Sequence, residues 1–457
     1  MQTSLVVRMA CGIIVLGAVL ATACQPKSDA GSDSAAGRSA AATRAQTARP
    51  CPGDNAGLTL PSGFCATLFA DSLGHARHLV VADNGDVYVN TWSGRYYTTK
   101  PPAGGFLVAL RDTNHDGRAD QRARFGATPA SGGSGGTGIA LYNRMLYAEE
   151  GSRIVRYPLP PNGMAPTGSA ETVVRGLPLT GDHPMHPFAI DSGGTMYMNS
   201  GSATNACQAR NRVPGVPGQK PCTELQTRGG IWSFDAKKTN QVFTPTARYA
   251  TGIRNAVGVA IGPGNALYST QHGRDQLETW TKLYTPEQGQ NLPAEELLRI
   301  EKGADFGWPY CYYDDKQQKL VLAPEYDGDG GKALGDCASK ATPIAAFPAH
   351  WAPDGLLFYT GTAFPARYRD GAFIAFHGSW DRAPGPQGGY QVVFQPLSAD
   401  NGSTSYATFA NGFAGAVMQP DAAAHRPVGL AQGRDGALYI ADDQGGRVWR
   451  VTYGTGK

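Results

Sequence analysis

Short alternations of apolar and polar residues, separated by tight turns, recur along the chain. In each copy an alternating strand leads into a turn with Gly, Asp or Asn, and a strand with small and aromatic residues follows. The copies begin at His78, Gly138, Pro187, Gly258, Val428 and, in degenerate form, Leu356. Such alternation around turn residues predicts β-hairpins. Six units without helical periodicity between them predict an all-β fold, a six-bladed β-propeller.

Residues 251–277 give the most detailed prediction. An alternating run at 257–261, a Gly-Pro-Gly-Asn turn and a second apolar run predict a hairpin. Arg254 and Asn255 precede its first strand, and the polar segment 272–275 follows its second. A buried guanidinium needs an anionic partner, so Arg254 indicates a bound anion. An arginine that caps loop carbonyls is the alternative.

Two other segments complete the expected architecture. Residues 447–453 alternate strongly and predict a strand that finishes the last blade or pairs with the start of the domain. The stretch at about 280–352 is the longest interruption of the repeat and holds a helix-like run at 293–303. Since it has too little apolar content for a core of its own, we expect an insert that covers one face and shapes a pocket.

Composition agrees with an all-β fold and argues against nucleic acid as a partner. Sixty Gly, 32 Pro and 17% charged residues among 457 describe a turn-rich chain with few long helices. The formal net charge is +3, and no long run of Lys or Arg is present. The electrostatic footprint of a nucleic-acid-binding protein is therefore missing.

The N-terminal residues predict export. Arg8 precedes an apolar run at 10–23 that is too short to span a bilayer and has the form of a signal peptide, here residues 1–23. The end of this run resembles a bacterial lipobox, which predicts acylation of Cys24; an ordinary cleavable signal is the alternative. Residues 24–50 form an Ala/Ser-rich, disordered tether, and 51–457 form the propeller. We expect an exported, periplasmic lipoprotein whose link to the membrane is the lipid.

Six cysteines follow residue 50, and an even number in an exported protein predicts disulfides. The expected pairs are sequence neighbours: Cys51 with Cys65, Cys207 with Cys222, and Cys311 with Cys337. Residues 112–120 (DTNHDGRAD) space oxygen ligands as in the first half of an EF-hand loop but lack its closing glutamate. A structural Ca²⁺ and a solvated turn both remain open there.

Residues able to do chemistry stand at the ends of the predicted strands. They lie in 181–186 (GDHPMH), 254–255 with 272–275, 377–382 (HGSWDR) and 425–429 (HRPVG). In a propeller, segments that lead into equivalent strands meet at one end of the central channel. We therefore expect His183, Arg254, Arg382 and Arg426 to face one cavity. A histidine suits proton transfer near neutral pH, and His186 is the alternative base.

At these motifs the chain resembles the sorbosone dehydrogenase-like branch of the quinoprotein sugar dehydrogenases, relatives of soluble glucose dehydrogenase that use pyrroloquinoline quinone (PQQ). The similarity extends from about Arg77 to Tyr453. It is carried by GDH at 181, YMNSGSATN at 197, GIRNAVG at 252, HGRDQL at 272, ADFGWP at 304, HGSWDR at 377, and RPVG and LYIADD near the end. The resemblance implies a six-bladed propeller with PQQ over the channel mouth and Ca²⁺ bound to the quinone.

The resemblance also implies roles for individual residues. They are His183 as catalytic base, Arg254, Asn255 and Arg426 as cofactor-holding groups, and the backbone carbonyls of Gly273 and Arg274 as Ca²⁺ ligands. These roles agree with chemistry, because guanidinium groups bind carboxylates bidentately and PQQ has three. A hard cation with oxygen ligands polarises a carbonyl.

The chain departs from glucose dehydrogenases at several positions. Ser202 stands where they have an aspartate that orients the base, Gly135-Gly136-Thr137 replaces a glutamine near the cofactor, and their Gly-Pro calcium turn is Gly273-Arg274. For their cofactor lysine the candidates are Arg382 and Trp380.

The sequence thus predicts a PQQ- and Ca²⁺-dependent dehydrogenase of a sugar or sugar aldehyde, aldose or sorbosone-like, with an unknown electron acceptor. Two alternatives stay open. A Ca²⁺-dependent lactone hydrolase would need Asp or Glu around a channel metal, and we expect few acidic residues at the strand ends. A non-catalytic binding propeller is kept open by Ser202 and by the missing glutamine.

Overall fold

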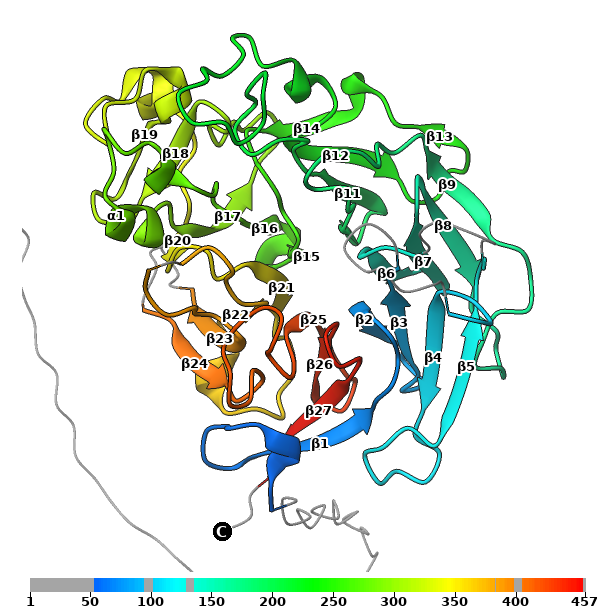
Figure 1. The fold of residues 1–457 in the computed structure, drawn as a ribbon. Helices are drawn as coiled ribbons and strands as arrows, with labels where there is room; N and C mark the ends of the chain where they lie inside the picture. Colours follow the sequence, from blue (N-terminus) through cyan, green and yellow to red (C-terminus); the bar gives the residue numbers. More distant parts are fainter. Residues whose placement is uncertain (1–52, 94–101, 129–134, 383, 398–404, 455–457) are drawn as a thin grey trace, which may run out of the picture. The chain divides into compact units, whose positions relative to one another are not determined.

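A computed structural model describes residues 53–93, 102–128, 135–382, 384–397 and 405–454. These residues belong to the second of two units, 48–457, into which the chain divides. Their strands form six blades arranged in a ring, which confirms the six-bladed β-propeller (Figure 1).

Each blade is an antiparallel sheet of four strands, and one blade has an added fifth strand. The first blade contains β2 (Ala76–Val81), β3 (Val87–Thr91), β4 (Leu107–Arg111) and β5 (Gln121–Phe125), and the second contains β6 (Ile139–Tyr142), β7 (Met145–Glu150), β8 (Arg153–Pro158) and β9 (Glu171–Arg175). The third contains β10 (Phe188–Ile190), β11 (Thr195–Ser200), β12 (Gly230–Asp235) and β14 (Arg248–Thr251), and the fourth contains β15 (Val259–Ile261), β16 (Leu267–Gln271), β17 (Glu295–Ile300) and β20 (Ala345–Phe347). The fifth contains β21 (Pro353–Phe358), β22 (Gly371–Phe376), β23 (Gln391–Pro396) and β24 (Ala407–Ala410). A short strand, β13 (Gln241–Val242), adds to β9 in parallel. All six sequence units correspond to the first two strands of a blade, as the alternation predicts.

The sixth blade closes the ring by joining the two ends of the domain. Strands β25 (Pro427–Gln432), β26 (Leu438–Asp442) and β27 (Val448–Tyr453) supply three of its strands, and β1 (Phe64–Ala70) supplies the outermost. The register pairs Phe64 with Tyr453 and Leu68 with Trp449. Both expectations for residues 447–453 are therefore met by one strand, since β27 has β26 on one side and β1 on the other.

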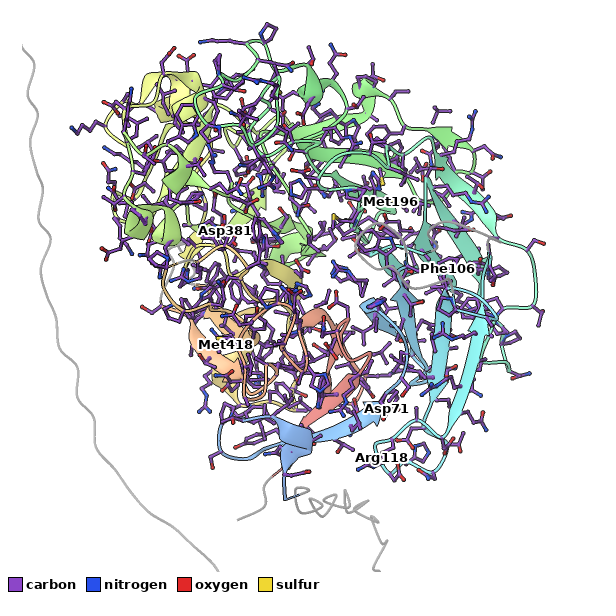
Figure 2. All side chains as sticks on the ribbon, in the orientation of Figure 1. Asp71, Phe106, Arg118, Met196, Asp381 and Met418 are labelled. Carbon is purple, nitrogen blue, oxygen red and sulfur yellow. A yellow bond between two sulfur atoms is a disulfide. The ribbon has the colours of Figure 1, made fainter. Side chains whose placement is uncertain are left out.

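The hydrophobic core lies between neighbouring blades rather than at a single centre. Six clusters of buried side chains fill the six spaces between blades. Phe106 and Met196, labelled in Figure 2, are both fully buried. Around the closing blade the packing is aromatic: Phe64 has an edge-to-face contact with Phe364 at a centroid distance of 4.8 Å and another with Phe409 at 4.9 Å. Such pairs add stability beyond the area they bury.

The helix-like run at 293–303 is a strand, and this prediction was wrong. Its EELLRI core forms β17, which pairs with β16 on one side and with β20 on the other. Helix propensity is a weak prior that tertiary contacts override, and here five of the six β17 side chains are buried between sheet neighbours. The 280–352 stretch consequently contains two blade strands, β17 and β20, besides its loops.

Among the described residues, the loops of this stretch hold the single α-helix and a separate hairpin. They are α1 (Pro286–Asn291) and the pair β18 (Cys311–Asp314) and β19 (Lys319–Leu322). Short 3-10 turns lie at Asn55–Gly57, Thr223–Gln226, Pro245–Ala247, Pro263–Asn265, Leu277–Thr279, Pro324–Tyr326, Gly335–Ser339 and Ala366–Tyr368. Helix α1 begins with a capping box, in which Thr285 and Gln288 exchange side-chain to backbone hydrogen bonds.

The structure confirms two of the disulfide pairs, Cys207 with Cys222 and Cys311 with Cys337. Cys51, the partner proposed for Cys65, lies outside the described residues, as do the signal, the lipobox and the whole tether. Within the described part of the chain, no helix is both long enough and apolar enough to cross a membrane.

Candidate active site

Segments from five of the six blades, all but the one formed by β6–β9, meet in one cavity of about 800 Å³. Two kinds of segment reach it: those that lead into an innermost strand, and those that join the second strand of a blade to the third. In an up-and-down blade these segments lie on the same face of the propeller. The ionisable lining comprises His75, Arg77, Asp182, His183, Arg212, Arg254, His272, Asp275, Glu295, His350, Asp354, His377, Asp421, Arg426 and Asp443.

His183 lies on this cavity as a buried histidine with a defined hydrogen bond. Its Nδ1 is 2.9 Å from the backbone carbonyl of Ser202 and 3.0 Å from Ser202 Oγ. Because the carbonyl can only accept, Nδ1 carries the hydrogen and Nε2 keeps a lone pair. Burial, with Arg254 as the next cause, holds the pKa of His183 well below its usual value. The ring is therefore neutral at pH 7.

Ser202 occupies the position that the sequence comparison assigned to an orienting aspartate, and it does orient His183. Its hydroxyl donates to Thr204 O at 2.7 Å, which turns an oxygen lone pair toward His183 Nδ1. Gly201 permits this approach, since a Cβ at Gly201 would lie 2.6 Å from His183 Cβ. A neutral hydroxyl and a carbonyl thus replace a charged partner.

Asn255 lies on the cavity with one buried atom unsatisfied. Its Oδ1 makes no hydrogen bond in the described part of the chain. Leaving a buried polar atom without a partner costs about 1–3 kcal/mol. A ligand that donates a hydrogen bond to Asn255 would remove this cost.

Arg254 caps loop carbonyls, as the alternative interpretation of its position predicted, and a bound anion stays a prediction. It caps two loop carbonyls, donating to Asn205 O from Nε and to Gly273 O from Nη1, and it pairs with Asp275 at 2.8 Å. A further bond joins Nη2 to Asn205 Oδ1. A guanidinium has five N–H groups, so one remains on Nη1 for a ligand in the cavity. Arg212 also contacts Asp275 at 2.8 Å, and the two arginines lower the pKa of that carboxyl against the opposing effect of burial.

Arg426 is a cation without a carboxylate partner among the described residues. Its Nε and Nη2 donate to the carbonyls of His377 and Gly378, and its guanidinium lies 5.6 Å from the ring centroid of Tyr390. These bonds leave Nη1 uncommitted. On an open cavity wall, such a group is suited to bind an anionic ligand.

The HGSWDR motif divides between cavity and loop. Trp380 lines the cavity with 52% of its surface exposed, and Arg212 lies 5.9 Å from its ring centroid. Arg382 is not part of the lining; it donates to Gln290 O and Ala349 O and so ties two loops together. The expectation that Arg382 faces the shared cavity was therefore wrong.

The two residues expected to hold calcium differ in their placement. Gly273 lines the cavity, and its carbonyl already accepts the bond from Arg254. The side chain of Arg274 is buried in a bidentate pair with Glu325 and is not on the cavity. A carbonyl oxygen has two lone pairs, so Gly273 keeps one for a cation.

His186, the alternative base, is fully buried beside Glu149, whose carboxylate receives the backbone N–H groups of Thr137 and Gly138. It does not line the cavity. These contacts link two neighbouring blades. Because His186 does not reach the cavity and His183 does, the geometry favours His183 as the base.

Arg77, His272, Asp354, His377 and Asp443 form a buried network of charged groups that was not predicted from the sequence. Asp354 has Arg77 at 3.3 Å and His272 at 3.0 Å, the latter at an angle outside hydrogen-bond geometry. Asp443 has Arg77 at 2.6 Å and His377 at 2.8 Å. The expectation of few acidic residues at the strand ends was therefore wrong. Their signal was present in the motifs HGRD, PDG and ADD, but only the fold shows that they share one site.

Fold and site together define a propeller whose channel mouth combines a neutral histidine with arginines. Residues 58–454 match the TrAA12-like family, and the chain belongs to that family. The matches confirm the sequence resemblance to PQQ-dependent sugar dehydrogenases.

Two curated relatives are similar over part of the chain. An uncharacterised protein of Borreliella burgdorferi is 34% identical over 208 residues, which is 45% of this chain and 48% of that protein. A pyrroloquinoline quinone-dependent pyranose dehydrogenase of Coprinopsis cinerea is 26% identical over 234 residues, 44% of this chain and 30% of that protein. The chain thus spans half or less of these relatives.

Solved structures match over nearly the whole fold. A Trichoderma reesei enzyme of carbohydrate-active enzyme family AA12 superposes with a TM-score of 0.68 at 19% identity, covering 87% of this chain and 98% of that one. The holo PQQ domain of the Coprinopsis cinerea pyranose dehydrogenase gives 0.67 at 19% identity, covering 86% and 97%. At this identity the likeness shows the shared fold.

Proposed function

We propose that the protein is a PQQ-dependent dehydrogenase that oxidises a hydroxyl group of a sugar or sugar aldehyde. The observation that carries this proposal is His183, held as a neutral base in the same cavity as Arg254 and Arg426. The family and its pyranose dehydrogenase relative support the same chemistry. The sugar, aldose or sorbosone-like, and the electron acceptor are the open parts of the proposal.

The cavity fits PQQ in size and charge. A volume of about 800 Å³ lies in the range of small-molecule sites. Arg426 and the remaining N–H of Arg254 offer charge-assisted bonds to carboxylates, and Asn255 Oδ1 offers an unused acceptor. Trp380 offers an aromatic face at the rim.

When bound, PQQ supplies a quinone that accepts a hydride from the substrate carbon. The chain's own part is the proton. His183 Nε2 accepts the hydroxyl proton of the sugar, while Ser202 receives the hydrogen bond from Nδ1–H and stabilises the imidazolium. After the transfer, the His183 imidazolium is desolvated and close to Arg254. Because both effects lower the pKa of His183, the imidazolium loses its proton readily.

Calcium belongs to the proposal as well. The carbonyl of Gly273, with that of Arg274 beside it in the chain, supplies the oxygen ligands that Ca²⁺ takes. The free lone pair of Gly273 and the cavity location support this role. The cofactor would have to supply further ligands.

The decisive test is dye-linked oxidation of a panel of aldoses and sorbosone by purified protein, with and without PQQ and Ca²⁺. We expect turnover that needs both additions. Absence of PQQ binding in the presence of Ca²⁺ would contradict the proposal, and lactone hydrolysis would then be the activity to assay.

Replacing Arg426 by alanine is expected to weaken PQQ binding by about 10–100-fold, since a hydrogen bond to a charged group contributes about 1.5–3 kcal/mol. Titration of PQQ against protein fluorescence measures the change. Arg382→Ala is the matched control, because it removes the same charge from the adjacent loop outside the cavity lining. Equal losses in both variants would show that Arg426 acts through folding alone.

Replacing Ser202 by alanine is expected to lower kcat roughly fivefold with little change in KM, because one neutral hydrogen bond is worth about 1 kcal/mol. His183 keeps its bond to the carbonyl of residue 202. Steady-state kinetics beside Ser192→Ala, an exposed serine of the same blade, checks the result. A rise in KM with constant kcat would contradict an orienting role.

We also propose that the protein is exported and held at the membrane by a lipid on Cys24, facing the periplasm. The signal-like residues 1–23 support this, and the two disulfides suit an oxidising compartment. Labelling with a palmitate analogue, lost in Cys24→Ser, would establish the lipid; a soluble, unlabelled protein would contradict it.

A further inference from the structure

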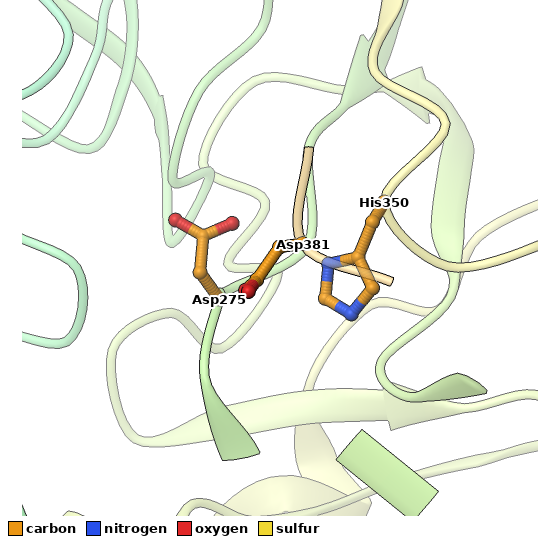
Figure 3. Close-up of side chains that lie close together, drawn as sticks. All are labelled: Asp275, His350 and Asp381. Atoms are coloured by element: carbon orange, nitrogen blue, oxygen red, sulfur yellow. The ribbon is translucent and has the colours of Figure 1, made fainter. Parts of the chain in front are cut away.

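Three side chains without a part in the proton transfer lie close together (Figure 3), and two of them, Asp275 and His350, line the cavity. Asp275 follows β16, His350 precedes β21 and Asp381 follows β22. One ligand atom from each, two carboxylate oxygens and a ring nitrogen, lie within 4.8 Å of one another. The propeller thus brings together three metal-ligand side chains that are far apart in the sequence.

His350 is held with a lone pair directed at the two carboxylates. It is 6% exposed, and its Nε2 lies 2.9 Å from the backbone carbonyl of Gly289 in helix α1. Because a carbonyl only accepts, Nε2 carries the hydrogen and Nδ1 is the acceptor in the neutral ring. Figure 3 shows the ring turning one nitrogen toward Asp381. Among the described residues this acceptor makes no hydrogen bond, since Nε2 makes the one bond of the ring.

Each carboxylate also keeps an oxygen in reserve. Asp275 uses Oδ2 for Arg212 and Arg254, and Asp381 uses Oδ2 for the backbone N–H of Gln276 at 3.1 Å. In the described part of the chain, Oδ1 of neither carboxylate accepts a hydrogen bond. Burial, and next the charge of Asp275, raise the pKa of Asp381 to about 6.

The spacing argues against a shared proton. Hydrogen bonds need heavy atoms within about 3.2 Å, and within the described residues no hydrogen bond or ion pair joins His350 to either carboxylate. Three acceptors facing a common gap repel one another unless a cation lies between them. Tetrahedral ligands at about 2.1 Å from a metal lie roughly 3.4 Å apart, so the side chains would close by about an ångström.

We propose that Asp275, His350 and Asp381 form a binding site for a divalent first-row transition ion of the Zn²⁺ class. One imidazole and two carboxylates suit such an ion, whereas Ca²⁺ takes oxygen ligands. The site is distinct from the Gly273 and Arg274 carbonyls and does not rest on the proposed function. Asp275 and His350 line the cavity, from which a ligand oxygen can complete the coordination.

The test is calorimetric titration of Zn²⁺ into the purified chain without PQQ or sugar. We expect one site, weakened at least about tenfold in Asp381→Asn, because even outer-shell changes cost metal sites 10–100-fold. Asp421→Asn, which removes a carboxylate from the cavity lining but outside this group, is expected to leave the affinity for Zn²⁺ unchanged. His350→Gln is a second variant that keeps Asp275 and its arginine pairs.

Several results would overturn the site. They are equal Zn²⁺ affinity in the Asp381 and Asp421 variants, tighter binding of Ca²⁺ than of Zn²⁺ at the position lost in Asp381→Asn, and absence of Zn²⁺ binding. Because PQQ and sugar are left out, failure of this site is separable from failure of the dehydrogenase proposal.

Discussion

Replacing His183 by alanine is expected to lower kcat of sugar oxidation by about 10²–10⁴-fold, the usual contribution of a positioned general base. The variant should still bind PQQ, because the arginines that attract its carboxylates are unchanged. Stopped-flow reduction of the bound cofactor by sugar isolates this step from reoxidation by the dye. A variant with unchanged reduction rate would remove His183 from the mechanism. Loss of PQQ binding would assign it to the cofactor site instead.

The same residue sets an expectation for pH. A general base works only when it is unprotonated, and burial with Arg254 keeps the pKa of His183 well below 6.5. As pH falls, kcat for cofactor reduction should therefore stay constant through pH 6.5 and decline only at lower pH. A fall in kcat with its midpoint at or above pH 6.5 would contradict a desolvated base.

Replacing Asp354 by asparagine is expected to destabilise the propeller by about 3–5 kcal/mol, the cost of breaking a buried ion pair from one side. Asp354 lies between Arg77 and His272, which would lose their shared counter-charge. Urea unfolding followed by tryptophan fluorescence measures the change. Asp71→Asn, an exposed aspartate labelled in Figure 2, is the control and should stay within about 0.5 kcal/mol. Equal midpoints for both variants would contradict a structural role for the network.

The pH dependence of this contribution has a definite sign. Arg77 and His272 hold the pKa of Asp354 below its unfolded value, against the opposing effect of burial. The stabilisation is thus complete above the unfolded pKa, about 3.9, and is lost as pH falls through the lower, folded value. The gap between the parent and the Asp354 variant should therefore be constant from pH 5 to 6.5 and close in stronger acid. At higher pH the part contributed by His272, whose pKa Asp354 raises against the opposing effect of burial, should fade as the ring loses its proton.

The sequence was sufficient for the fold because the propeller repeats one local signal. Each hairpin shows period-two alternation and a turn, so six imperfect copies are mutually supporting evidence. The prediction for 293–303 was wrong because EELLRI has good helix formers. Its strand conformation depends on pairing with β16 and β20, which are distant in the sequence and cannot be recognised as partners from it. Glu295 lines the cavity from that strand, so the error also concealed a site residue.

The site was foreseen where a motif carried its chemistry and missed where only geometry did. His183, Arg254 and Arg426 stand in recognisable phrases at strand ends. Asp354 and Asp443 stand in the short motifs PDG and ADD, but their role follows from three neighbours on different blades, Arg77, His272 and His377. Arg382 is the opposite case. It stands in a motif close to Trp380, but its guanidinium binds loop carbonyls instead of facing the cavity.

The pairing of β1 with β27 imposes an order on biosynthesis. Strand β1 leaves the ribosome first and waits for its partner until the last residues of the chain have been made. During that interval the open ring has unpaired strand edges on both sides of the gap, and such edges recruit other chains. A chain that ends before Val448 would lack β27 and keep these edges unpaired permanently, so we expect truncation at that point to yield aggregate rather than a slightly shorter protein.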